Sequence, residues 1–161
     1  MPSSTQDIIA RTEKEVMTGR GRWIADFNES FRDFRVQDVK FDVLIKGNTR
    51  MKGFILSRVF SHFLNPNYEV AFFILSVSPG KRIDRRHLQR PLSAIEWYME
   101  RNYVKWSWLV VVGEGLDDTI RRTVESVADQ SIGVVYIDSG SRGMINSNSY
   151  LGRQIRKYVK V

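Results

Sequence analysis

The sequence predicts an α/β protein in which helices flank a mixed β-sheet. Three observations predict this class. Several β-rich runs lie close together between residues 39 and 78, and helical and strand patterns alternate from residue 91 onward. Hydrophobic residues make up 42% of the chain and charged residues 27%. A chain of 161 residues with this composition can bury one core, so we expect a single domain over residues 1–161.

Residues 1–35 are expected to be a helical N-terminal segment in two parts. Ser4 and Asp7 have the spacing of a capping box, and apolar residues then recur at helical intervals to about Met17. Glycines at 19 and 21 interrupt this pattern. The part after them carries an apolar stripe whose spacing predicts a second amphipathic helix, formed by Trp23, Ile24, Phe27, Phe31 and Phe34.

Residues 39–78 are expected to form a three-strand meander. The first run, Val39–Ile45, alternates, and Gly47-Asn48 after it is a turn signal that predicts a hairpin. The second run, Met51–Phe60, is β-rich and precedes a turn signal at Asn65-Pro66-Asn67. The third run, Tyr68–Val77, is almost continuously apolar, which is typical of a strand buried on both faces.

Residues 91–161 are expected to form βα crossovers. Pro91 suits the first turn of a helix, and Asp117 or Asp118 can cap the next one. Apolar runs at 106–112 and 133–137 predict strands, and a polar loop over 138–143 follows. The tail from 148 to 160 is expected to be helical, and its buried side would carry Tyr150, Leu151, Ile155 and Tyr158.

The charge of the chain indicates a polyanionic partner. There are 25 Lys and Arg against 18 Asp and Glu, a net charge of +7, and the pI is about 9.9. Basic residues concentrate in three blocks, at 39–60, 81–90 and 142–161, and we expect these blocks to converge on one face. Each phosphate that a cation neutralises releases counterions and adds affinity. The predicted nucleic-acid-binding residues are Lys46, Arg50, Lys52, Lys81, Arg82, Arg85, Arg86, Arg90, Arg142, Arg153, Arg156 and Lys157.

The order of elements resembles the restriction-endonuclease-like superfamily, also called PD-(D/E)XK nucleases. The similarity is closest in SWLVVVGEGLDDTIRRTVESVADQSIGVVYIDSGS, which reads as a strand, a capped helix, and a strand that ends in a polar turn. The resemblance implies a core of one helix, a three-strand meander, a second helix and a further strand. It also implies nuclease chemistry, in which two carboxylates hold Mg²⁺ and a lysine orients the attacking water.

The residues that this chemistry needs are missing from their expected places. The strand that should hold an acid and a lysine ends in Ser76-Val77-Ser78, and the run before it, which ends at His62, contains no Asp. We therefore expect a catalytically degenerate member, with no catalytic residues, no metal site and no cofactor. Asp42, Glu69 and Lys81 form the alternative, a metal-dependent nuclease with a migrated active site.

The predicted function is an accessory nucleic-acid-binding protein in DNA or RNA metabolism. A second alternative is a non-catalytic subunit of a nuclease or of a replication or repair complex, which would bind a protein partner or a second copy of the chain. The chain has no cysteine, which excludes disulfides, zinc fingers and thiol catalysis. No apolar run is long enough to cross a bilayer and no secretory signal is visible, so we expect a cytoplasmic protein without a membrane partner.

Overall fold

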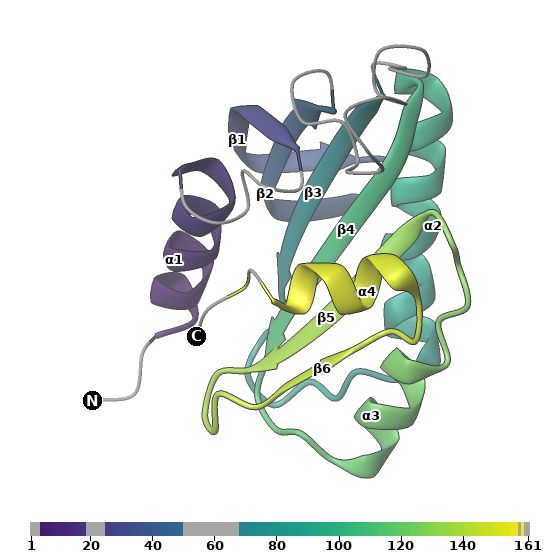
Figure 1. The fold of residues 1–161 in the computed structure, drawn as a ribbon. Coiled ribbons are helices and arrows are strands. Elements are labelled where there is room, and N and C mark those ends of the chain that lie inside the picture. The colour runs from purple at the N-terminus through teal and green to yellow at the C-terminus, as the bar shows by residue number, and fades with distance from the viewer. Residues whose placement is uncertain (1–3, 19–24, 50–67, 158, 160–161) are drawn as a thin grey trace.

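A six-stranded mixed sheet forms the centre of the molecule in the computed structural model, which describes residues 4–18, 25–49, 68–157 and 159. The strands lie in the sheet in the order in which they occur in the chain (Figure 1). They are β1 (Asp26–Val36), β2 (Val39–Asn48), β3 (Glu69–Ser76), β4 (Val104–Gly113), β5 (Ile132–Asp138) and β6 (Met144–Asn146). The pairs β1–β2, β2–β3 and β5–β6 are antiparallel, while β3–β4 and β4–β5 are parallel. The predicted mixed α/β class is therefore confirmed.

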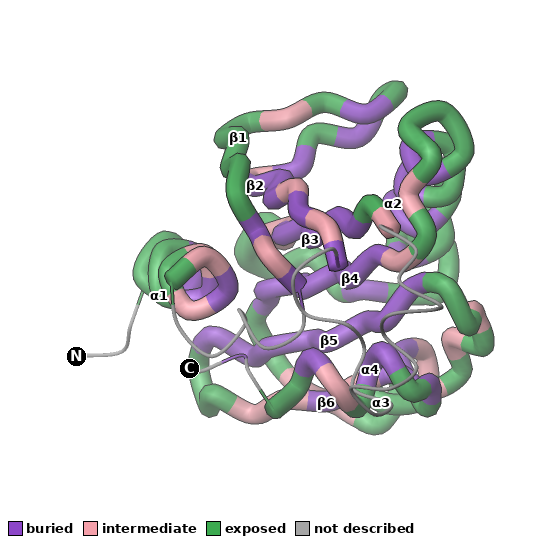
Figure 2. Tube along the Cα trace, turned by 45° about the horizontal axis from the view of Figure 1, so that its top comes forward, coloured by how far each residue is buried: buried purple, intermediate pink, exposed green. Residues whose placement is uncertain are grey.

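Helices cover both faces of this sheet. They are α1 (Thr5–Thr18), α2 (Arg85–Asn102), α3 (Asp118–Glu125) and α4 (Tyr150–Arg156). The apolar sides of α2 and α3 pack on one face, with Phe73 and Leu109 of the sheet. The apolar sides of α1 and α4 pack on the other face, with Phe72 and Val110. Figure 2 shows the result as long buried stretches of β4 and β5 between the helices.

Polar side chains cap all four of the described helices, and the caps of α1 and α3 lie where the sequence predicts them. The capping box of α1 is closed in both directions: Ser4 N–H donates to Asp7 Oδ2 at 3.0 Å, and Asp7 N–H donates to Ser4 Oγ at 3.2 Å. Asp117 caps α3 by accepting the Ile120 N–H at 2.8 Å. Two caps were not predicted, Asp84 for α2 and Ser149 for α4. These bonds satisfy backbone donors that a helix leaves open at its N-terminus.

The second predicted N-terminal helix is wrong, because residues 26–36 form the edge strand β1. Phe27 and Phe31 are four residues apart, a separation that keeps two side chains together on a helix or on a strand. Pairing with β2 favours the strand over the helix, since a tight turn at Gln37 (φ 54°) brings Val36 opposite Val39. A register shift between Phe27 and Glu29 further breaks the alternation that would have indicated a strand. Trp23 and Ile24 lie outside the described residues.

The hairpin predicted at Gly47-Asn48 is also wrong, because β2 continues through both residues. Gly47 serves close packing here: a Cβ at this position would lie 2.6 Å from the Asp26 carbonyl oxygen of β1. The antiparallel meander therefore consists of β1, β2 and β3, and it begins earlier than residue 39. The strand and turn predicted over 51–67 lie outside the described residues. The buried strand predicted at Tyr68–Val77 is confirmed as β3.

The second half follows the prediction with three differences. The helix expected to begin at Pro91 begins at Arg85, so Pro91 lies inside α2 and the basic block 85–90 is helical. The last helix is shorter than expected, and Tyr150 at its start is 60% exposed instead of buried. The short edge strand β6 was not predicted. Among the described residues, no helix is both long enough and apolar enough to span a membrane.

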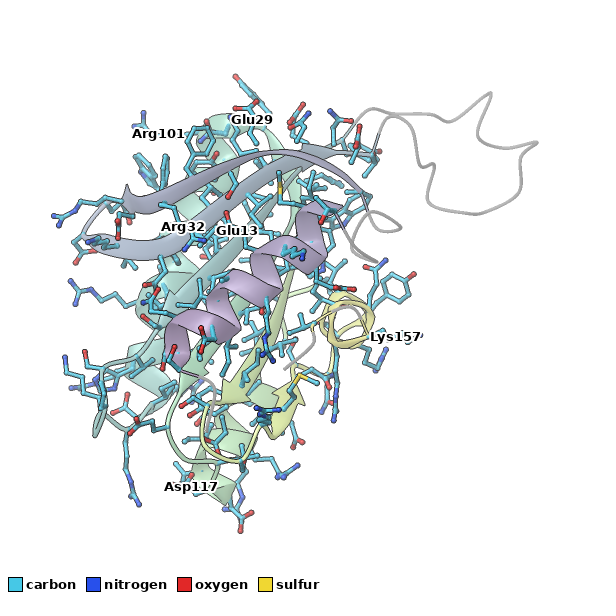
Figure 3. All side chains as sticks on the ribbon, turned by 90° about the vertical axis from the view of Figure 1, so that its left-hand side faces the viewer. Glu13, Glu29, Arg32, Arg101, Asp117 and Lys157 are labelled. Carbon is cyan, nitrogen blue, oxygen red and sulfur yellow. The ribbon has the colours of Figure 1, made fainter. Side chains whose placement is uncertain are left out.

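The β1–β2 hairpin contacts α2 on one side of the sheet and α1 on the other. The tip of the β1–β2 hairpin curls over α2, where the Phe34 ring meets Tyr98 edge to face at 6.1 Å. On the opposite side, Glu13 of α1 accepts hydrogen bonds from Arg32 and from Ser30 of β1, and Figure 3 shows Glu13 and Arg32 pointing toward one another. These contacts leave a hollow between the hairpin tip, the end of β3 and the start of α2.

Candidate nucleic-acid interface

Residues 81–90, the α2 basic segment, run from the end of the β3–α2 loop into the first turns of α2. Two apolar side chains anchor this segment: Ile83 and Leu88 are each 4% exposed and belong to the core beneath α2. The anchors leave the other side chains of the segment in contact with solvent. All five of its cations are exposed, namely Lys81, Arg82, Arg85, Arg86 and Arg90.

The acids near this segment compensate only part of its charge. Asp84 is the N-cap of α2; the His87 backbone N–H donates to it at 2.9 Å, and this bond is the main reason that the pKa of Asp84 is lowered. Arg82 pairs with Asp117 at 3.7 Å, and Arg90 Nε donates to Asp38 at 3.0 Å. Within the described residues, the remaining three cations of the segment form no ion pair: Lys81, Arg85 and Arg86.

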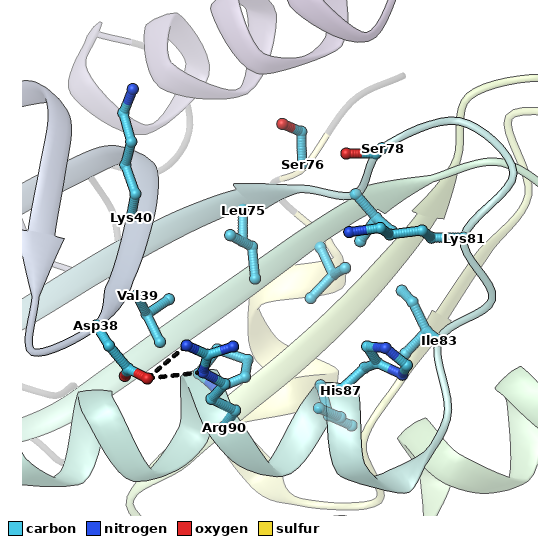
Figure 4. A pocket seen from close by; sticks show the side chains of 14 residues that line it. Asp38, Val39, Lys40, Leu75, Ser76, Ser78, Lys81, Ile83, His87 and Arg90 are labelled. Atoms are coloured by element: carbon cyan, nitrogen blue, oxygen red, sulfur yellow. Dashed lines mark hydrogen bonds and ion pairs between the residues drawn. The ribbon is translucent and has the colours of Figure 1, made fainter.

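A cleft of about 280 Å³ lies beside the α2 basic segment (Figure 4). Its basic rim comes from three elements: Lys40 from β2, Lys81 from the loop, and His87 and Arg90 from α2. Asp38 at the hairpin tip is the acid on this rim, and Arg90 holds its pKa below the ordinary value, chiefly through the side-chain hydrogen bond. The apolar lining consists of Val39, Leu75, Val77, Ile83, Leu88, Pro91 and Val111.

The cleft lies where the pairing in the sheet changes from antiparallel to parallel. Strand β3 pairs with β2 in one sense and with β4 in the other. Its carboxyl end stays attached to β4, since Val77 N–H donates to the Val112 carbonyl at 2.8 Å. Ligands of open α/β sheets bind beyond the carboxyl ends of the strands, because the loops that leave there frame a crevice. The cleft therefore lies at a position in the sheet where open α/β proteins commonly bind ligands.

The alternative nuclease site is not assembled. Asp42 accepts the Ser76 N–H at 2.6 Å, at the carboxyl end of β3, whereas Glu69 begins that strand and pairs with Asn48. Six residues of extended strand separate positions 42 and 48, which is about 20 Å. The structure therefore does not bring Asp42, Glu69 and Lys81 together. Over the parts of the chain that are described, no three potential metal-binding side chains of the types His, Cys, Asp or Glu lie in one group.

The predicted convergence of the basic blocks on one face is wrong. Arg153, Arg156 and Lys157 lie at the end of α4, and α4 covers the sheet face opposite α2. Arg142 lies in the β5–β6 turn and Lys46 is half-buried in β2, while Arg50 and Lys52 lie outside the described residues. The two parallel crossovers place α2 and α3 on the same face, as right-handed connections do. The β5–β6 turn then reverses the chain, and α4 packs on the other face.

A second group of polar residues, at the ends of β4 and β5, is structural. Asp138 accepts hydrogen bonds from the backbone N–H groups of Gly115 at 2.9 Å, Gly140 at 3.0 Å and Ser141 at 3.3 Å. Burial favours a raised pKa for Asp138, but the Ser141 hydroxyl and these N–H groups outweigh it, and the net pKa is lowered. Because its oxygens are already bonded, Asp138 joins two loops rather than acting as a free base.

The neighbouring Tyr136 completes this clasp. Its hydroxyl donates to the Gly115 carbonyl at 2.7 Å, and burial, followed by the charges of Asp138, Asp117 and Glu114, raises its pKa to about 12. The hollow beside the clasp is lined by Glu114 and Asp138 as well as by backbone and hydroxyl groups. Two carboxylates would repel a phosphate, so the hollow beside the carboxyl ends of β4 and β5 is a poor anion site.

Aromatic side chains contribute mainly to the core. Trp108 is fully buried and meets Phe27 edge to face at 6.0 Å. Trp106 packs against Tyr68 at 5.0 Å, and the Lys105 ammonium lies 5.7 Å from the Tyr68 ring centre. Tyr103, at the left-handed C-cap of α2, is 88% exposed. The rings of Tyr68, Tyr103 and Trp106 lie at the amino ends of β3 and β4, and the cleft lies beyond the carboxyl end of β3.

Comparisons with known proteins do not assign the chain to a family. A scan against protein-family profiles finds no match, and searches of curated proteins and of solved structures find none either. The resemblance to restriction-endonuclease-like proteins therefore depends on the order of elements alone. The function has to be inferred from the charge and geometry of the molecule itself.

Proposed function

We propose that this protein binds nucleic acid through its phosphate backbone and that the α2 basic segment is the contact surface. The observation that carries the proposal is that Arg85 and Arg86, which form no ion pair within the described residues, lie at the end of a helix that disfavours cations. Arg85 and Arg86 occupy the first turn of α2, which contains no acid. The N-terminus of a helix carries a partial positive charge, so cations there reduce helix stability.

Helices α1 and α3 show the ordinary arrangement, whereas α4 has no acid in its first turn but carries its arginines in the last turn. Asp7 lies in the first turn of α1 and Asp118 in the first turn of α3, where acids are favourable. A solvated basic face would also carry acids four residues away, but Gln89 and Arg90 follow Arg85 and Arg86 at that spacing. Two arginines beside one capping acid, Asp84, leave net positive charge at a helix terminus that disfavours cations, and a local arrangement that costs stability is typical of a functional surface. A polyanion supplies the missing negative charge.

The order and direction of the elements support a restriction-endonuclease-like topology as part of this proposal. One helix, three antiparallel strands, a second helix and a strand parallel to the third follow one another. On this alignment the catalytic acid and lysine would fall at Ser76-Val77-Ser78, and Asp42 alone lies beside them. We therefore propose binding without cleavage, in an accessory role in DNA or RNA metabolism.

Salt dependence tests the mechanism directly. Fluorescence anisotropy with single- and double-stranded DNA and RNA, at several salt concentrations between about 50 and 200 mM, would give a slope of log Kd against log salt. Three phosphate contacts predict a slope of magnitude about 2 to 3 for wild type and close to zero for a K81A/R85A/R86A variant. A wild-type affinity that does not change with salt would contradict the proposal.

Incubation with Mg²⁺ or Mn²⁺ tests the non-catalytic part. The expected result is intact substrate after prolonged incubation of each nucleic acid with the wild-type chain. Cleavage that disappears in Asp42→Ala but survives in Asp33→Ala would show that a metal-dependent site has persisted. Asp33 serves as the control because it is an exposed β1 carboxylate that forms an ion pair with Lys40, at 3.2 Å.

A further inference from the structure

We propose that the cleft beside α2 binds a phosphomonoester attached to a small organic body, such as the phosphorylated end of a nucleic-acid strand. This inference deepens the proposed function and rests on it. The α2 basic segment would follow the backbone, while the cleft would recognise the end of the strand. Two features of the cleft carry the inference, namely its mixed lining and its size.

The rim offers several cationic donors around one hollow. Figure 4 shows Arg90 and His87 at separate positions along α2, with Lys81 reaching toward the cleft from the loop above His87. Lys81 forms no ion pair within the described residues, whereas Arg90 is held by Asp38 and the His87 ring by Asp84. A terminal phosphate carries nearly two charges at neutral pH and three acceptor oxygens, so it can bind several such donors at once. An internal phosphodiester carries one charge.

The apolar lining of the cleft indicates a ligand that is larger and less polar than a free phosphate ion. The volume of about 280 Å³ exceeds the space that a five-atom phosphate fills. The remaining space lies against Leu75, Val77 and Val111 of the sheet and Pro91 of α2. A sugar or base edge would cover these side chains, and burial of apolar surface would add to affinity. A continuous strand would extend beyond a hollow of this size on both sides, so a terminal group fits better.

The test compares oligonucleotides of one sequence that end in a 5′-phosphate, a 3′-phosphate or hydroxyls only. Wild type is expected to bind one phosphorylated form about tenfold more tightly than the hydroxyl form, because charge-assisted bonds form only with the monoester. Lys81→Ala and His87→Ala should reduce this preference to about twofold or less. Both side chains are exposed, so both variants should fold.

Arg86→Ala is the matched control, because Arg86 belongs to the same segment but does not line the cleft. It should weaken binding of every oligonucleotide and leave the ratio between phosphorylated and unphosphorylated forms unchanged. A wild-type ratio near one, with salt-dependent binding intact, would overturn the end-recognition inference and leave the proposed function standing. A ratio that Arg86→Ala reduces as strongly as Lys81→Ala would also overturn it.

Adenosine 5′-monophosphate, adenosine and inorganic phosphate separate the two sources of this chemistry. Calorimetric binding of the monophosphate but of neither fragment would support a site that needs both the phosphate and the organic body. If the monophosphate binds while no oligonucleotide does, the cleft chemistry holds for a free nucleotide and the proposed function fails. If inorganic phosphate competes as well as the monophosphate, the apolar lining takes no part and the inference is wrong.

Discussion

The basic residues of α2 and of α4 lie on opposite faces of the sheet and at opposite ends of their helices. On α2, Arg85 and Arg86 lie in the first turn of an 18-residue helix, against the helix dipole and beside a cleft. On α4, Arg153 and Arg156 lie in the last turn of a 7-residue helix, where cations are favourable. Arg156 also donates to Asn146 at 2.9 Å. The two α4 arginines thus have a structural explanation, whereas Arg85 and Arg86 of α2 form no ion pair within the described residues.

The two helices are also held differently. α2 buries an apolar face that includes Leu88, Ile95 and Met99. α4 depends on close backbone contact, since a Cβ on Gly133 of β5 would lie 2.6 Å from the Leu151 carbonyl carbon. A short helix that is held by glycine contacts tolerates little change, whereas a long amphipathic helix can carry varied residues on its outer side. The number of cations in a segment therefore does not by itself indicate a binding site.

The largest difference is expected in nucleic-acid affinity. K81A/R85A/R86A should lose about 50-fold in affinity at constant salt, since each phosphate contact contributes about 1 kcal/mol or slightly less. R153A/R156A/K157A removes the same formal charge from the α4 face and should lose about threefold or less. Anisotropy titrations with one oligonucleotide measure both. Equal losses would mean that net charge, rather than the α2 surface, determines binding.

Gly133→Ala tests how α4 is held. The added methyl group would collide with the backbone of Leu151 and Gly152, neither of which can move without displacing α4. We expect the free energy of unfolding to fall by about 2 kcal/mol, measured by urea denaturation. Affinity for nucleic acid at a temperature where the variant is folded should not change. A loss of affinity there would connect α4 to the binding surface.

Asp138→Asn tests the clasp that Asp138 and Tyr136 form at the carboxyl ends of β4 and β5. The lowered pKa means that the ionised carboxylate stabilises the folded state above about pH 4, and that this contribution is lost as the pH falls through the folded pKa. The variant should lose about 1–2 kcal/mol at neutral pH and show a flatter decline in acid. Urea unfolding between pH 3 and 7 measures this. If the free energy of unfolding falls between pH 7 and pH 3 as steeply in the variant as in wild type, other carboxylates cause most of that fall.

Acids in the first turn of α2 should improve stability while they abolish binding. R85E/R86E replaces unfavourable cations by favourable anions, and we expect about 0.5 kcal/mol per position, or a rise in Tm of about 2–4 °C in total. Affinity for nucleic acid should fall further than in the alanine variant. Thermal unfolding by circular dichroism gives Tm. A lower Tm would mean that the two arginines already have stabilising partners.

The smallest effect concerns the second half of α2. Burial, followed by a hydrogen bond with Asp129 and the charges of Asp129 and Glu100, raises the pKa of Glu96. A raised carboxyl pKa contributes stability at low pH that is lost as the pH rises above about 4.5 through the folded value. Glu96→Gln should remove this decline and raise Tm at pH 7 by about 1 °C. Glu100→Gln is the control, and it should change the pH profile less.

Elements with one strong pattern were predictable, and elements with two possible patterns were not. The capping box at Ser4 and Asp7 and the apolar run of β3 each allow one interpretation, and both are confirmed. Phe27 and Phe31 fit a helix and a strand equally well, and the prediction chose the helix. In the candidate site, the basic block at 81–90 was visible in the sequence. The cleft beside it was not visible in the sequence. One side of the cleft is the tip of the β1–β2 hairpin, and a helix was predicted where β1 lies.

The sequence alone established which segments are basic, where α1 and α3 are capped and that β3 is buried. Each of these features depends on residues that are close together in the chain. Only the folded chain decided which basic segment faces a hollow. Arg90 meets Asp38 across 52 positions, and α4 lies on the sheet face opposite α2 after the chain reverses at β6. Such placements follow from strand pairing and from the direction of crossovers, which depend on contacts between distant residues that no local pattern encodes.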